Sequence, residues 1–234
     1  MLRLFVARDA IREGRVALSG EDLRHLRTLR LGPESELTVF DETGHEHTVR
    51  LESVDRRRAL GRVIATVRVD RESPLELVLA PALLKGPRMD VLIEKATELG
   101  VRGIAPVLTD RCVAHRGHVE RWRRIALAAA KQCGRTTVPR IEDPAPLATR
   151  LGTPWPGMRL CAFEGATAPG WDELPDRASA AVVLLGPEGG FTADEVDAIR
   201  AAGFQAIGLG RRILRAETAA IAAAALCQRR WGDG

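Results

Sequence analysis

From residue 75 to the C-terminus, apolar segments alternate with amphipathic ones, and this alternation limits the folds that the chain can adopt. Residues 75–84 form an apolar run broken only by Glu76, which is typical of a buried parallel strand. Residues 87–99 then carry apolar side chains at helical spacing, and Gly100 marks the end of that helix. Further strands are expected at 103–108, 158–163, 180–185 and 205–209, and further helices at 118–133, 192–202 and 217–230. This order predicts a three-layer α/β domain with a mainly parallel sheet.

The first 72 residues have a different pattern, which is rich in β-strands. Alternating polar and apolar residues predict strands at 2–7, 36–40, 46–53 and 60–69, with one short helix at 20–31. Residues 41–44, Asp-Glu-Thr-Gly, form a turn signal that joins two strands into a hairpin. The polar segment 70–74 ends in Pro74 and interrupts any strand. We therefore expect two domains, a small barrel or sandwich at 1–72 and the α/β domain at 73–234.

The positive charge of the chain is concentrated in one segment. Only three of the 35 basic residues are lysines, and the chain lacks Tyr and Asn, so a GC-rich genome explains the general excess of arginine. Residues 102–140, however, carry nine basic and two acidic side chains, a net charge of +7 against +4 for the whole chain. Such a segment indicates either a binding surface for a polyanion or a solvated helix face.

Several classes of protein are disfavoured by composition. No apolar run reaches the ~18 residues that span a bilayer, and the segment 1–9 carries charges too early for a secretory signal. We therefore expect a cytoplasmic protein. The four cysteines, Cys112, Cys133, Cys161 and Cys227, form no CxxC pair and are expected to be buried thiols. No metal site is expected.

Two glycine-bearing loops are the candidate ligand site. Residues 186–191 (Gly-Pro-Glu-Gly-Gly-Phe) and 209–218 (Leu-Gly-Arg-Arg-Ile-Leu-Arg-Ala-Glu-Thr) each follow an expected strand and precede an expected helix. Ligands of parallel sheets bind beyond the carboxyl ends of the strands, and glycines let a backbone approach a ligand closely. Neither loop matches the dinucleotide or the P-loop pattern. Each loop alone is also compatible with a plain turn and an ordinary helix cap, but together they favour one pocket.

With these loops the chain resembles the RsmE family, whose members are ribosomal RNA uridine-N3 methyltransferases of the SPOUT (trefoil-knot) superfamily. The resemblance continues in family order over nearly the whole chain, through 25–30, 85–89, 94–101, Pro106, 121–122, 132–135 and 138–139. Cys112, Cys133 and Ala216 stand where the family often has Ser, Ser and Thr.

The resemblance implies a fold, a reaction and partners. The fold would be a small N-terminal PUA-like β-barrel that binds RNA, followed by a SPOUT α/β domain with a C-terminal trefoil knot. The cofactor would be S-adenosylmethionine, and the substrate the decoding-region uridine of 16S ribosomal RNA in the small ribosomal subunit, methylated at N3. The protein would be a homodimer with its active site near the subunit interface.

Candidate site residues follow from the loops and the resemblance together. We expect Arg215 to support the negative charge of a deprotonated uracil, and Glu217 or Glu188 to act as the base or an orienting group. The expected cofactor-binding residues are Phe163, Glu164, Leu185, Gly186, Glu188, Gly189, Gly190, Leu209, Gly210, Ile213, Leu214, Arg215 and Thr218. The expected RNA-binding residues are Arg88, Arg121, Arg124 and Arg135.

Two other classes of function are compatible with parts of this pattern. A non-catalytic RNA-binding module would use the same basic segment and barrel, but it does not require the pair of glycine-bearing loops. A small-molecule enzyme that uses an adenine nucleotide is a third possibility. Against it, no phosphate-binding lysine follows the glycines, and no acidic cluster offers a magnesium site.

Overall fold

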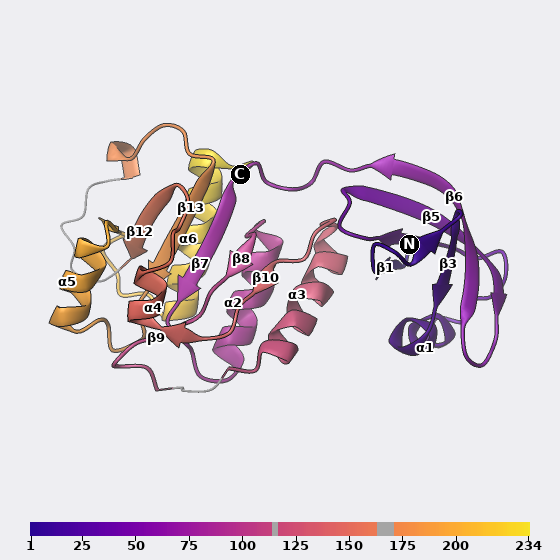
Figure 1. Ribbon diagram of the computed structural model, residues 1–234, viewed down its shortest axis with the longest axis horizontal. Helices are drawn as coiled ribbons and strands as arrows, with labels where there is room; N and C mark the ends of the chain where they lie inside the picture. The colour runs from indigo at the N-terminus through magenta and orange to yellow at the C-terminus, as the bar shows by residue number, and fades with distance from the viewer. Residues whose placement is uncertain (114–116, 163–170) are drawn as a thin grey trace. The chain divides into compact units, whose positions relative to one another are not determined.

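The computed structural model describes residues 1–113, 117–162 and 171–234. The chain forms two compact units (Figure 1). Unit 1 comprises Met1–Glu72 and Ala130–Val138, and unit 2 comprises Ser73–Ala129 and Pro139–Gly234. The segment that ends the third helix thus belongs to the N-terminal unit, which nothing in the local sequence pattern indicated.

Unit 1 is a six-stranded sheet with one helix. Its strands, in spatial order, are β1 (Arg3–Phe5), β4 (Glu36–Phe40), β5 (His45–Val54), β6 (Ala59–Arg68), β3 (Arg15–Leu18) and β2 (Ile11–Arg12). The pair β1–β4 is parallel, and the other pairs are antiparallel. The long β5–β6 hairpin has two register shifts. Such bulges bend and twist a sheet, so that it can wrap around a core.

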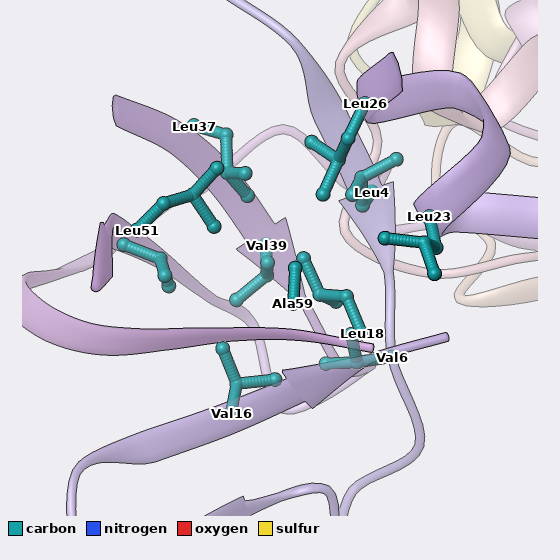
Figure 2. Packing of buried hydrophobic residues seen from close by; sticks show 11 residues of the cluster. Leu4, Val6, Val16, Leu18, Leu23, Leu26, Leu37, Val39, Leu51 and Ala59 are labelled. Carbon is teal, nitrogen blue, oxygen red and sulfur yellow. The ribbon is translucent and has the colours of Figure 1, made fainter. Parts of the chain in front are cut away.

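The core of unit 1 is made by alternate residues of these strands together with helix α1 (Gly20–Thr28). Figure 2 shows Leu23 and Leu26 pointing from α1 toward Leu37 and Val39 of β4. The helix is shorter than predicted, because Arg30 adopts the left-handed conformation (φ 55°) and ends it. Strands β2 and β3 were not predicted.

Unit 2 contains a six-stranded sheet in which every described pair is parallel. Its strands, in spatial order, are β10 (Arg140–Ile141), β8 (Gly103–Ile104), β7 (Glu76–Pro81), β13 (Ala180–Leu185), β12 (Met158–Ala162) and β14 (Gln205–Ile207). Strands β9 (Val107–Leu108) and β11 (Ala145–Pro146) form a separate pair. The predicted strand 103–108 is therefore wrong as one element, because Pro106 has no N–H to donate to a ladder.

Helices cover both faces of this sheet. They are α2 (Pro87–Glu98), α3 (Val119–Cys133), α4 (Leu147–Leu151), α5 (Ala193–Ala201) and α6 (Ala216–Trp231), with a 3₁₀ turn at Trp171–Glu173. Val182 and Leu184 of β13 pack in one core with Leu147 of α4 and Ile199 of α5. Helix α6 instead contacts α2, β7 and β13, so the chain returns from the edge strand β14 to the middle of the sheet. The predicted three-layer α/β architecture is confirmed.

Two negative findings concern the described residues only. No described helix is long and apolar enough to cross a membrane, and no three metal-ligating side chains gather in the part of the chain that the structure describes. All four cysteines are free thiols, of which Cys133 is half-buried and the others are buried. Burial raises the pKa of the Cys161 thiol to about 12, so this residue is a packing group rather than a nucleophile.

Candidate functional site

A cavity of about 450 Å³ lies at the carboxyl ends of β12, β13 and β14 in unit 2. Its size falls within the ~300–1,000 Å³ range of pockets that bury small organic ligands. Both glycine-bearing loops line it, together with the start of α6. The lining residues are Ala162, Leu185–Glu188, Gly190, Phe191, Val196, Gly208–Ala216 and Ala219. Segments at the carboxyl ends of three different strands of the sheet therefore build one site.

The first loop, 186–191, turns sharply and packs tightly. Gly190 has a φ of 68°, which L side chains rarely adopt, and its N–H donates to the carbonyl of Pro187 at 2.9 Å. A Cβ on Gly186 would lie 3.1 Å from the Phe191 ring, so only glycine lets this ring close the loop without a shift. Thr192 then begins α5 with the predicted capping box to Glu195.

The second loop, 208–215, leads into α6. Gly210 has a φ of 103°, and the indole Nε1 of Trp171 donates to the carbonyl of Gly208 at 2.9 Å. Arg215 is the N-cap residue of α6, and its side chain makes no capping hydrogen bond. The first N–H groups of the helix have no capping side chain from Arg215, and a helix start of this kind can donate to acceptors in the cavity.

A third segment, which the sequence did not single out, holds the first loop. The guanidinium of Arg111 donates through Nη1 to the carbonyl of Gly189 at 2.7 Å and to that of Phe191 at 3.4 Å. The buried carboxylate of Glu195 accepts the N–H of Asp110 at 2.9 Å as well as that of Thr192. The loop is thus fixed from both sides by residues that do not line the cavity.

The charged side chains at the cavity have different surroundings. Glu188 lines the cavity and forms an ion pair with Arg88, which lies in the first turn of α2. Arg215 lines the cavity, is exposed, and forms no salt bridge with any described residue. Glu217 does not line it, although its Oε2 is buried and has no hydrogen-bond partner among the described residues. Of the two carboxylates expected at the site, only Glu188 lines the cavity.

The structure thus brings together most of the expected cofactor residues. Those that line the cavity are Leu185, Gly186, Glu188, Gly190, Leu209, Gly210, Ile213, Leu214 and Arg215. Gly189 and Thr218 belong to the same two segments but do not line it. Phe163 and Glu164 lie outside the described residues. Arg111 and Trp171 were missed, because both act through contacts to backbone groups remote in sequence.

Three of the four expected RNA-binding arginines form ion pairs with acidic residues. Arg88 pairs with Glu188, and Arg121 donates to Asp90 at 2.6 Å. Arg124 is exposed and has no ion pair among the described residues. The side chain of Arg135 is only 4% exposed and pairs with Glu72, so in this structure it is a buried ion-pair partner, and its assignment to RNA stays a prediction.

Other cations of the segment 102–140 are paired too. Arg123 pairs with Glu120, Lys131 with Asp22 and Arg140 with Glu142. For this segment the solvated and structural interpretation is therefore better supported than a binding surface for a polyanion.

Comparison with known proteins places this geometry in a class. Residues 71–228 match the family model described as an RNA methyltransferase domain, and residues 18–64 match the RNA methyltransferase PUA domain. The crystal structure of a ribosomal RNA small subunit methyltransferase E from Neisseria gonorrhoeae, bound to S-adenosyl methionine, superposes with a TM-score of 0.92 at 36% identity. That match covers 100% of this chain and 99% of the other.

Curated relatives agree. The ribosomal RNA small subunit methyltransferase E of Synechocystis sp. is 34% identical over 93% of this chain and 74% of the relative. That of Mesomycoplasma hyopneumoniae is 32% identical over 94% and 96%. Fold and site therefore define an RNA methyltransferase with an N-terminal PUA-like domain and a SPOUT-type α/β unit. More particularly, the chain belongs to the ribosomal RNA small subunit methyltransferase E family, which its motifs predicted.

Proposed function

We propose that this enzyme transfers the methyl group of S-adenosylmethionine to N3 of a decoding-region uridine in 16S ribosomal RNA. The observation that carries the proposal is the cavity built by two glycine-bearing strand-end loops. Arg215 lies on its wall and has no salt bridge to any described residue. The substrate follows from family membership, because relatives over most of this chain are named for the small-subunit ribosomal RNA.

The residues at the cavity fit the proposed cofactor. Its walls combine apolar residues, such as Leu185 and Leu214, with the glycines Gly186, Gly190 and Gly210, which have no side chain of their own to cover the backbone. An adenine ring needs apolar faces and backbone hydrogen-bond partners at its edge, and these loops provide both. When bound, S-adenosylmethionine supplies an electrophilic methyl group on a sulfonium. The chain's own task is to align the uracil with that group and exclude water.

Arg215 is the residue that we assign to the uracil. N3 of uracil carries a proton and is a poor nucleophile until that proton leaves, and the resulting negative charge is shared with O2 and O4. A guanidinium held at the cavity wall stabilises that charge as it develops. We propose that Glu188, or a water beside it, accepts the N3 proton, because Glu188 lines the cavity and Glu217 does not. Opening of the Arg88–Glu188 ion pair would free the carboxylate.

The remaining features complete the proposal. Residues 1–72 serve as the PUA-like RNA-binding domain and residues 73–234 as the SPOUT methyltransferase domain. The enzyme acts as a homodimer with its active site near the subunit interface, and it works in the cytoplasm, where small ribosomal subunits are found.

The reaction is tested by transfer of labelled methyl from S-adenosylmethionine to unmodified small ribosomal subunits and to stripped ribosomal RNA. Nucleoside analysis of the product should give 3-methyluridine. Faster transfer to the small subunit than to stripped RNA would show that the enzyme recognises the shape of the assembled RNA. No transfer to either substrate, by a protein that binds both RNA and cofactor, would move the proposal to another RNA target. Loss of cofactor binding altogether would favour a binding module.

Arg111 provides a separate test of the cavity. We expect Arg111→Ala to raise the Kd of S-adenosylmethionine about 10-fold, because hydrogen bonds from a charged donor contribute about 1.5–3 kcal/mol and here they hold Gly189 and Phe191. Arg200→Ala is the matched control, since Arg200 is exposed on α5 and does not line the cavity. Isothermal titration calorimetry measures the Kd of S-adenosylmethionine for both variants. Equal Kd values would show that Arg111 does not support cofactor binding.

A further inference from the structure

The turn between β5 and β6 in unit 1 carries three consecutive arginines. Asp55 fixes this turn, because its Oδ1 accepts the N–H of Arg57 at 2.7 Å and that of Arg58 at 2.9 Å. The N–H of Asp55 also donates to the carbonyl of Arg58 at 2.9 Å. The side chains of Arg56, Arg57 and Arg58 are all exposed. A short turn held by its own backbone therefore displays three guanidinium groups.

Helix α1 extends this positive surface. Arg27 donates through Nη2 to the carbonyl of Asp55 at 2.7 Å, so the helix lies against the turn. Arg24 stands one helical turn before Arg27 and is likewise exposed. Figure 2 shows that Leu23 and Leu26 of the same helix point into the core, so that the core side of α1 is apolar. We call Arg24, Arg27, Arg56, Arg57 and Arg58 the arginine surface.

The arginine surface differs from the basic segment 102–140 in how its charges are balanced. None of its five guanidinium groups forms a salt bridge within the part of the chain that the structure describes. The acids beside it are Glu21, one turn before Arg24, and Asp55. The N–H groups of Arg57 and Arg58 lower the pKa of Asp55, which stays ionised and offsets one of the five charges.

Unpaired cations are the ones available to a polyanion. A paired arginine must first leave its carboxylate, whereas an unpaired one exchanges only water and counterions for a phosphate. All five residues also lie within 18–64, the segment that matches the RNA methyltransferase PUA domain. We infer that the arginine surface binds the phosphate backbone of the RNA substrate. This inference rests on the proposed function for the identity of that RNA.

The test compares two triple variants of the full chain that lose the same charge from the same unit. Arg56→Ala, Arg57→Ala and Arg58→Ala are combined in one variant, which keeps the N–H groups that Asp55 binds. The control combines Arg12→Ala, Arg15→Ala and Arg50→Ala, because these exposed arginines are paired with Asp9, Glu52 and Glu36. The probe is unmodified small-subunit ribosomal RNA over a range of salt concentrations.

We expect the first variant to bind this RNA roughly 50-fold more weakly near 0.15 M salt, and the control less than about 5-fold. Its salt slope should fall by about 2–3, since each phosphate contact contributes about 0.7–0.9. Its Kd for S-adenosylmethionine and its kcat at saturating RNA should not change. Asp55→Asn keeps the oxygen that accepts both N–H groups but removes the negative charge, and it should strengthen RNA binding a few-fold.

Other outcomes are equally informative. Equal losses in the two triple variants would overturn the inference, because they would reflect net charge alone. Unchanged RNA binding with reduced binding of a small-subunit protein would also overturn it and would make the surface a protein-docking site. If the wild type binds the RNA through this surface but methylates no uridine in it, the proposed reaction fails and the surface remains.

Discussion

Arg215→Ala is expected to lower kcat by about 100- to 1,000-fold while the Kd of S-adenosylmethionine stays within about 3-fold of the wild-type value. Removal of one group that stabilises a developing anion typically has an effect of this size. The side chain lines the cavity and has no salt bridge among the described residues, so its charge is free to act on the substrate. Its removal should not disturb α6, because Arg215 makes no side-chain capping bond there.

A matched variant separates local action from general charge. Arg211 also lines the cavity, is exposed and stands in the same loop, so Arg211→Ala removes the same charge from the same site. We expect it to change kcat less than about 5-fold. Arg215→Lys should recover part of the activity, since an ammonium keeps the charge but not the planar fork of donors.

The pH profile provides a second readout for Arg215. If the guanidinium stabilises the uracil anion, its loss makes N3 harder to deprotonate, and the rate of Arg215→Ala should keep rising to higher pH than that of the wild type. Equal kcat losses in Arg215→Ala and Arg211→Ala, or a profile that does not move, would contradict the assignment. The measurement is single-turnover methyl transfer at saturating cofactor and RNA.

The features that the sequence predicts well are those set by residues close together along the chain. The strand at Ala180–Leu185 and the capping box of Thr192 and Glu195 occur as predicted, because both depend on residues within a few positions of each other. Four short strands, β2, β3, β10 and β11, were missed, because pairing with other strands forms them. The helix at 118–133 was predicted within one residue, but nothing local showed that its last turn belongs to the N-terminal unit.

The candidate site divides in the same way. The two glycine-bearing loops could be predicted from the sequence, because in each a strand, a turn and a helix start follow one another along the chain. Arg111 was missed, because its partner Gly189 is 78 residues away. The buried ion pair of Arg135 was missed for the same reason, because its partner Glu72 lies 63 residues earlier. Net charge along a chain thus says little about which cations remain unpaired after folding.

Arg135→Ala is expected to lower the free energy of unfolding by about 3 kcal/mol, although the residue had been assigned to RNA. Its Nη2 and Nε donate to Glu72 at 2.8 and 3.1 Å, and both side chains are buried or nearly so. Removal of one partner of a buried ion pair leaves an uncompensated charge, which costs about 3–5 kcal/mol. Arg121→Ala removes an exposed arginine from its pair with Asp90 and should cost less than about 1 kcal/mol.

Acid should weaken the same contact. Burial acts to raise the pKa of Glu72, but the hydrogen bond and charge of Arg135, with further hydrogen bonds from Thr137, outweigh it and lower the pKa below its usual 4.5. A carboxyl whose pKa is depressed by folding stabilises the fold above its unfolded pKa and loses this contribution as the pH falls through its folded pKa. The stability difference between the wild type and Glu72→Gln should therefore shrink below about pH 4.5.

Denaturant titration followed by far-UV circular dichroism measures both effects, and RNA binding separates the two roles of Arg135. A structural arginine predicts that folded Arg135→Ala binds RNA within about 2-fold of the wild type and with the same salt slope. An RNA contact predicts instead a slope lower by about 1 and little loss of stability. That result would mean that the pair with Glu72 opens when RNA binds, and it would return Arg135 to the RNA-binding residues.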